Sequence, residues 1–226
     1  MEGMLFQASL FLGVIPALLL LYVSLKGYEG LYKDKIIFLA FIVGIALGFV
    51  SIIIESITLD IGVFFIILYP ILEQMLKTMV LNIGRFQGKK ETVIYGLTLG
   101  LGFGAISIPF SLISSHIEVP SGLMVILSVI VGSFSIMLVH AATGLCLGYG
   151  VYRKRVFYYL AYAILLHVPV TLFFFLTALY RVEYMQLLLL IYGLILYWYM
   201  TRRIAPHILP DFRRRQRRRN IVKKEV

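Results

Sequence analysis

The sequence predicts an all-α membrane protein with seven transmembrane helices, its N-terminus outside and its C-terminus in the cytoplasm. Three observations support this fold class: the composition, the spacing of the apolar segments and the distribution of the basic residues. The chain has 226 residues, of which 61% are hydrophobic and 14% charged. Its mean hydropathy of +0.94 is far outside the range of a soluble domain of this length.

Seven apolar segments follow one another between short polar breaks. Each is long enough to cross a hydrocarbon core of about 30 Å at about 1.5 Å per residue. The first segment is interpreted as a helix and not as a signal peptide, because Glu2 stands at its start and no small-residue cleavage site follows it. The predicted transmembrane domain covers residues 1–201, with spans near 4–25, 36–54, 61–83, 92–115, 122–151, 156–180 and 184–201.

The basic residues alternate between the two ends of these spans. The breaks at 26–35, 84–91 and 152–155 hold three Lys or Arg each, and the tail over residues 202–226 holds ten. In contrast, the breaks at 55–60, 116–121 and 181–183 hold one between them, Arg181. This asymmetry predicts a cytoplasmic C-terminus by the positive-inside rule, and it requires an odd number of spans.

The formal net charge of +10 also raises the question of nucleic-acid binding. Topology accounts for most of that charge, and a basic segment beside a membrane is attracted to anionic head groups by about 1 kcal/mol per residue. We therefore expect membrane lipids, and no nucleic acid, as partners of the tail. Cys146 is the single cysteine, which excludes a disulfide framework and a cysteine zinc site.

Four ionisable residues fall inside the apolar spans: Glu73, Lys77, His140 and His167. Glu73 lies 12 residues from Arg85, and the two histidines lie 13 and 12 residues from the nearest basic break, so all three are about 18 to 20 Å from the cytoplasmic side. Ionisable groups at this depth are costly and are functional candidates by default. A single histidine is more often a packing residue, but the shared depth favours a common site.

Lys77 follows Glu73 by one helical turn and allows two interpretations. It forms an i, i+4 ion pair with Glu73, or its ammonium extends toward the cytoplasm. Pro70, Pro109 and Pro169 each free a backbone carbonyl near these polar groups, which indicates a polar cavity near mid-membrane. The candidate polar residues of this cavity are Gln74, Ser107 and Thr171.

Rows of small residues predict where helices pack closely. Gly96, Gly100 and Gly104 repeat every four residues in the fourth span. Gly144 and Gly148 continue the same spacing from His140 in the fifth. Such rows let two helix backbones approach each other in a membrane.

One carboxylate and two imidazoles form the ligand set of many catalytic zinc sites. A hydrolase also needs a general base, usually a second carboxylate, and Gln74 at the neighbouring position cannot transfer a proton. Two other classes are less favoured. The glycine rows favour close helix contact over a bis-histidine haem, and the seventh span has no lysine for a retinal.

The motifs "EQMLK" (73–77), "GLGFGAISI" (100–108), "HAATGLCLGYG" (140–150) and "LHVPVT" (166–171) resemble the PrsW-type intramembrane metalloproteases and the type II CAAX endopeptidases in order and spacing. Three departures from the PrsW pattern remove polar groups that its chemistry uses. Gln74 replaces a glutamate, Ser107 and Ile108 replace a Glu-Asn pair, and Thr171 replaces Asn or Asp. The resemblance implies a degenerate site in which Glu73, Lys77 and both histidines remain.

The chain resembles the anterior-pharynx-defective subunit of gamma-secretase more closely. The stretch Gly100 to Ile113, "GLGFGAISIPFSLI", is similar to that family's fourth helix, although Ile108 stands where the family has its third glycine. The resemblance implies a seven-span, non-catalytic scaffold in which the histidines support the fold. It also implies partners, namely an intramembrane aspartyl protease and other membrane subunits.

Two functions follow from these resemblances. The first is a non-catalytic scaffold, a pseudoprotease without a cofactor, that supports an intramembrane protease or another membrane complex. The alternative is an active PrsW-like zinc metallopeptidase that uses Glu73, His140 and His167, with Lys77 beside them. In either case we expect an integral protein of the plasma membrane with its C-terminal tail in the cytoplasm.

Overall fold

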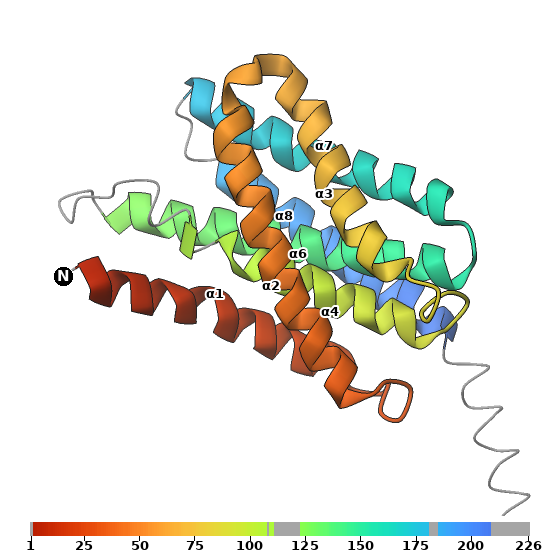
Figure 1. Cartoon of the computed structure of the whole chain (residues 1–226). Helices are drawn as coiled ribbons and strands as arrows, with labels where there is room; N and C mark the ends of the chain where they lie inside the picture. The colour runs from red at the N-terminus through yellow and green to blue at the C-terminus, as the bar shows by residue number, and fades with distance from the viewer. Residues whose placement is uncertain (1, 108, 111–122, 181–184, 209–226) are drawn as a thin grey trace, which may run out of the picture.

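The computed structural model describes residues 2–107, 109–110, 123–180 and 185–208, and these residues form helices and connecting turns without a strand. The long helices run back and forth through one bundle (Figure 1). Their bounds are α1 Glu2–Leu25, α2 Asp34–Thr58, α3 Phe65–Leu81, α4 Glu91–Ala105, α6 Leu123–Tyr152, α7 Val156–Tyr180 and α8 Met185–Tyr199. The short 3-10 segment η1, Leu59–Phe64, joins α2 to α3.

Helices α4 and α6 form the centre of the bundle. Every residue of α4 from Thr92 to Ala105 is buried, and most of the membrane-length part of α6 is buried as well. The two helices pack on each other more extensively than any other pair, while α2 and α1 cover α4, and α7 and α8 cover α6. Helix α3 packs mainly on α7 and α6.

Glycine makes the α4–α6 contact possible. A Cβ added at Gly100 would overlap the carbonyl oxygen of His140, and one added at Gly96 would overlap that of Gly144. From the other side, a Cβ at Gly144 would overlap the carbonyl oxygen of Gly96. Backbone therefore lies against backbone along this contact, as small residues at fourfold spacing predict.

Five helical segments are long and apolar enough to cross a membrane: Asp34–Ile57, Gly62–Leu81, Ile130–Tyr152, Val156–Phe173 and Gln186–Ile208. The apolar part of α1 described here, Phe11–Leu25, is shorter, and α4 has 15 residues. The seven predicted spans coincide in place with seven helices, but length and composition support membrane crossing for these five among the described residues. The structure is compatible with a membrane-embedded protein.

Helix α4 ends earlier than the predicted span at 92–115. Proline at position 109 has no backbone N–H to donate to the carbonyl of Ala105, where α4 ends. Residues 108 and 111–115 of that span lie outside the described residues, as do the charge-poor break at 116–121 and Arg181.

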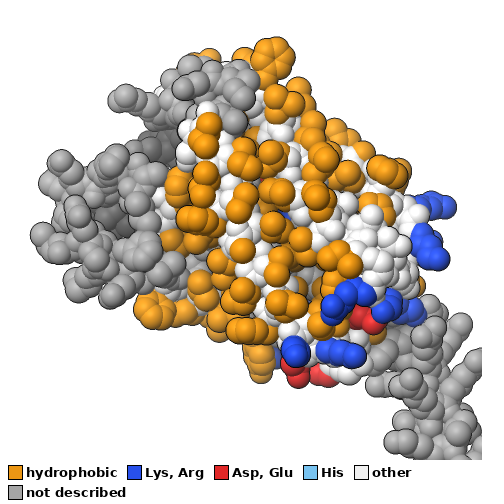
Figure 2. Space-filling view, viewed as in Figure 1, with side chains coloured by type: hydrophobic (Ala, Val, Ile, Leu, Met, Phe, Trp, Pro, Cys, Tyr) orange, Lys and Arg blue, Asp and Glu red, His pale blue; other side chains and the backbone are white. Residues whose placement is uncertain are grey.

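The basic connections gather at one end of the bundle. The α1–α2, α3–α4 and α6–α7 connections and the end of α8 all lie there (Figure 1). Figure 2 shows hydrophobic side chains across the viewed face and Lys and Arg side chains at one edge. The π segment Met200–Ile204 and the 3-10 segment Ala205–Ile208 continue α8, with Ala205 and Ile208 buried. Residues 209–226 of the tail lie outside the described residues.

Candidate functional site

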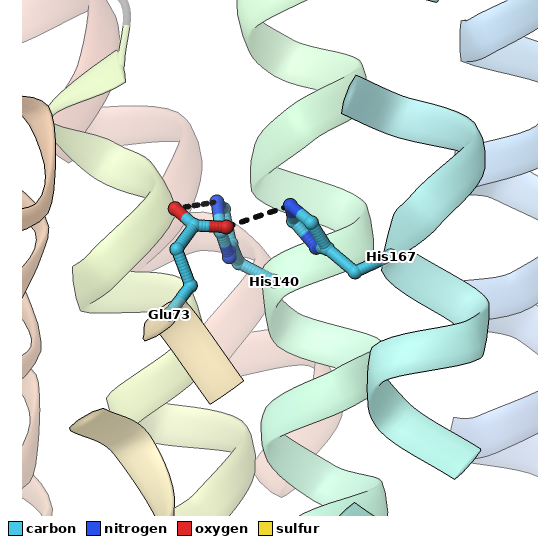
Figure 3. Close-up of side chains that lie close together, drawn as sticks. All are labelled: Glu73, His140 and His167. Atoms are coloured by element: carbon cyan, nitrogen blue, oxygen red, sulfur yellow. Dashed lines mark ion pairs between the residues drawn. The ribbon is translucent and has the colours of Figure 1, made fainter. Parts of the chain in front are cut away.

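Three helices bring Glu73, His140 and His167 together inside the bundle. Glu73 comes from α3, His140 from α6 and His167 from α7, and each side chain is at most 3% exposed. Nε2 of His167 lies 2.7 Å from Oε2 of Glu73, and Nε2 of His140 lies 3.7 Å from Oε1 (Figure 3). The two imidazole rings lie side by side, with their centroids 4.8 Å apart. We call these three residues and Lys77 the buried cluster.

Lys77 is fully buried, so its ammonium does not extend to the cytoplasm. Its Nζ lies 3.1 Å from Nδ1 of His140 and donates to Oγ1 of Thr143 at 3.1 Å. The same ammonium stands 4.9 Å from the ring centroid of Phe103 on α4. Lys77 therefore reaches α6 and α4, and the imidazole of His140 lies between it and the Glu73 carboxylate.

If Lys77 is protonated, its contact with Nδ1 determines the tautomer of His140. A lysine ammonium has three N–H donors and no acceptor, so Nδ1 of His140 must accept. Neutral imidazole then carries its proton on Nε2, the nitrogen that faces Glu73. With both histidines neutral, the ammonium of Lys77 balances the carboxylate of Glu73, and the buried cluster has no net charge.

Two polar side chains in this region have atoms without a partner among the described residues. Nδ1 of His167 and both amide atoms of Gln74 are buried without a hydrogen bond. A buried polar group without a partner costs about 1 to 3 kcal/mol. Hydrogen bonds among the described residues therefore do not offset the cost of burying these polar atoms.

The residue types of the cluster fit a zinc ion, but their surroundings do not. One ligand atom from each of Glu73, His140 and His167 lies within 4.8 Å of the others, and this is a common zinc donor set. However, a metal-bound histidine almost always donates its second N–H to a carboxylate, a backbone carbonyl or water. Nδ1 of His140 faces the Lys77 ammonium instead, and Nδ1 of His167 has no partner among the described residues. Coordination through Nε2 of His140 would require a neutral Lys77.

The glycines of α4 pack against the part of α6 that carries His140. Gly100 lies against the backbone of His140, and a Cβ on Gly104 would crowd Met137 on the preceding turn of α6. Gly148 lies against the backbone of Thr92. The close approach of α4 thus fixes the height of His140 in the bundle, and it allows the Phe103 ring to pack 4.6 Å from the imidazole.

The remaining predicted polar residues lie on the same helices. Thr171 is buried one turn after His167, and its hydroxyl donates to the carbonyl of Val168 at 3.3 Å. Ser107 is partly buried just beyond the end of α4. Ile108 lies outside the described residues.

Three residues that the sequence analysis missed extend the site along α2 and α3. The hydroxyl of Ser51 lies 3.2 Å from Oε1 of Glu73 and 3.1 Å from the hydroxyl of Tyr69. Tyr69 in turn donates to Oε2 of Glu55 at 3.0 Å. A sequence signal was available: Ser51 and Glu55, like Tyr69 and Glu73, are polar pairs at i, i+4 spacing on two consecutive apolar helices.

Comparison with known proteins identifies no family for this chain. No family model, curated protein or solved structure matches the chain.

Proposed function

We propose that this protein is a non-catalytic membrane scaffold, with a buried cluster that joins helices α3, α6 and α7 in one register. The observation that carries the proposal is the contact between the Lys77 ammonium and Nδ1 of His140. It leaves a proton on the nitrogen that a metal would need. It also places the Lys77 ammonium in the same buried cluster as the Glu73 carboxylate, and opposite charges lower the free-energy cost of burying each other.

The packing supports the same function. Buried polar contacts that form in one arrangement of helices disfavour other registers. Here the polar contacts connect α3, α6 and α7. Helix α4 packs against α6 through glycines at positions where a larger side chain would overlap the neighbouring backbone. Such a core is suited to hold a fixed surface toward a partner.

The partner we propose is another membrane protein, an intramembrane aspartyl protease or a further subunit of such a complex. The sequence resemblance to the anterior-pharynx-defective subunit supports this choice. In this proposal the chain is an integral protein of the plasma membrane, the basic end of the bundle is cytoplasmic, and the tail lies against anionic lipid.

A zinc-dependent peptidase is the second candidate. The observation that favours it is the gathering of Glu73, His140 and His167 within 4.8 Å in a buried place. This function requires that Lys77 lose its proton, so that Nδ1 of His140 can donate to it. It also requires a general base, since Gln74 cannot serve as one.

Metal content separates the two candidates. The full chain is purified in detergent as wild type and as His140→Ala, His167→Ala and His207→Ala, where His207 is an exposed histidine outside the cluster and serves as a control. The scaffold predicts no stoichiometric zinc in any sample, and lower thermal stability in the two cluster variants alone. About one zinc per chain, retained in His207→Ala and lost in both cluster variants, would support the peptidase.

A further inference from the structure

Two connections at the basic end of the bundle lie against each other. They are the α3–α4 connection, residues 82–90, and the α6–α7 connection, residues 153–155 (Figure 1). The backbone N–H of Gly88 donates to the carbonyl of Val151, on the last turn of α6, at 3.3 Å. A Cβ added at Gly88 would lie 3.3 Å from Cε of Lys154, so the lysine stem packs over this glycine. The basic residues of the two connections therefore share one surface, although they are far apart in the sequence.

This surface carries positive charge that acidic residues do not balance. Residues 82–91 and 153–155 hold six Lys or Arg and one acidic residue, Glu91. In contrast, residues 26–35 of the α1–α2 connection hold three lysines and two acidic residues, Glu29 and Asp34. Five of the six basic side chains are exposed and form no ion pair with a carboxylate of the described residues. We call these five the basic patch: Arg85, Lys89, Arg153, Lys154 and Arg155.

The positive-inside rule accounts for basic residues at this end, but not for the position of Lys154. At the end of α6 the N–H of Arg155 donates to the carbonyl of Gly150 and that of Lys154 to Val151, the Schellman pattern. Glycine is the usual residue at its left-handed position, yet Lys154 occupies it with a φ of 56°. Lysine is less favourable there than glycine, and Arg153 already supplies a cation beside it. A strained lysine favours a role for its charge beyond the orientation of helices.

Exposed apolar side chains stand beside the basic patch on the membrane-length helices. Ile83, two residues before Arg85, is 50% exposed, and Phe157, two residues after Arg155, is 86% exposed. Helices α3 and α7, which lead into and out of these two positions, pack against each other. A ligand with both phosphate groups and acyl chains would therefore contact cations and apolar groups of the same segments. A free phosphate would contact the cations alone.

We infer that the basic patch binds the head group of a phospholipid that carries more than one phosphate. One phosphate does not balance five cations, and clusters of about four to eight Lys or Arg beside a transmembrane helix are typical of sites for such lipids. The inference rests on the membrane embedding in the proposed function, and it holds for the scaffold and for the peptidase. Its test measures lipid affinity and the test of that function measures zinc, so either can fail without the other.

Binding of short-chain lipids to the full chain in detergent tests this inference. The probes are phosphatidylcholine, phosphatidylserine and phosphatidylinositol bisphosphate with the same acyl chains, and the soluble inositol trisphosphate head group. We expect the Kd of the bisphosphate lipid to be about tenfold lower than that of phosphatidylserine, because more cations of the patch contact its phosphates. The soluble head group should bind more weakly than the lipid, because it lacks the acyl chains.

Two triple variants with the same change in charge locate the site. The variant Lys89→Gln, Lys154→Gln, Arg155→Gln should raise the Kd of the bisphosphate lipid about a hundredfold, since three cations are lost beside an anionic head group. The basic tail is present in both variants, so its own attraction for lipid does not distinguish them. The control variant changes three exposed lysines of the α1–α2 connection and should keep the wild-type Kd: Lys26→Gln, Lys33→Gln and Lys35→Gln.

A charge-retaining variant separates loss of charge from misfolding. Lys89→Arg, Lys154→Arg, Arg155→Lys keeps three cations and should bind the bisphosphate lipid as the wild type does. Three results would each overturn the inference: equal Kd for phosphatidylserine and the bisphosphate lipid, equal Kd for that lipid and its soluble head group, or equal effects of the two glutamine variants.

Discussion

Nζ of Lys77 lies 3.1 Å from Nδ1 of His140, and the other nitrogen of that imidazole faces Glu73. Lys77 and Glu73 are one turn apart on α3, yet a side chain from α6 lies between their charges. The i, i+4 ion pair, one of the two interpretations that the sequence allowed, is therefore bridged by an imidazole from another helix. This arrangement connects the local charge pattern of α3 to the packing of the bundle, and four predictions follow from its geometry.

Removing one charge of the cluster should destabilise the protein more than removing both. Lys77→Met leaves the Glu73 carboxylate buried without its counter-charge, which costs about 3 to 5 kcal/mol for a buried pair. The double variant Lys77→Met, Glu73→Gln should recover much of that loss. The free energies of unfolding in detergent, measured for both single variants and the double variant, give the coupling. Additive effects would show that the two charges are independent.

Loss of the Thr143 hydroxyl should weaken the same cluster. Thr143→Val keeps the side-chain shape but removes an acceptor from the buried Lys77 ammonium, and hydrogen bonds to charged groups contribute about 1.5 to 3 kcal/mol. Thr98→Val is the matched control, since the Thr98 hydroxyl is equally buried and bonds to the Ile94 carbonyl of its own helix. Thermal unfolding should separate the two variants, and equal effects would contradict the role assigned to Thr143.

A methyl group at Gly100 should disrupt the α4–α6 contact. The new Cβ would overlap the carbonyl oxygen of His140, and overpacking of this kind typically costs about 1 to 3 kcal/mol. Gly84→Ala is the control, because nothing lies within 4 Å of a Cβ at that position. Melting temperatures should fall for Gly100→Ala alone. A similar fall in both variants would indicate a general effect of replacing glycine.

Zinc and chelators should leave the stability of the wild type unchanged. A ligand that binds the native state raises its stability with concentration, by about 2.7 kcal/mol at a hundredfold excess over Kd. If the Lys77 ammonium prevents the cluster from binding a metal, addition of zinc or of a chelator to the purified protein should not change its melting temperature. A rise with zinc that disappears in His167→Ala would show that the cluster binds the metal.

The sequence predicted the gathering of Glu73, His140 and His167 because depth along a helix follows from residue counts and a constant rise. It did not predict the partner of Lys77. That contact depends on the rotation of α3 about its axis and on which side chain of α6 faces it, and neither follows from counting. For the same reason the ion-pair and cytoplasmic interpretations of Lys77 stayed open until the helices were placed.

Glu55 was missed because the sequence analysis placed it in the polar break at 55–60. Helix α2 continues to Thr58, so Glu55 lies on its last turns, one turn after Ser51 and opposite Tyr69 on α3. Helix ends are set by local capping and by neighbouring elements, which hydropathy does not resolve. The end of α4 at Ala105 is a similar case, in which Pro109 leaves the Ala105 carbonyl without its helical donor and interrupts the helix, and helical residues resume at Ser107.

The tautomer of His140 distinguishes a cluster held by Lys77 from one that binds a metal. Nitrogen NMR of the histidine-labelled protein in detergent or lipid separates the two ring nitrogens, and the signals of His140 are assigned by their loss in His140→Gln. We expect a neutral imidazole with its proton on Nε2 and an unprotonated Nδ1 that accepts from Lys77. A proton on Nδ1 with an unprotonated Nε2, the form of a histidine that binds a metal through Nε2, would contradict this expectation.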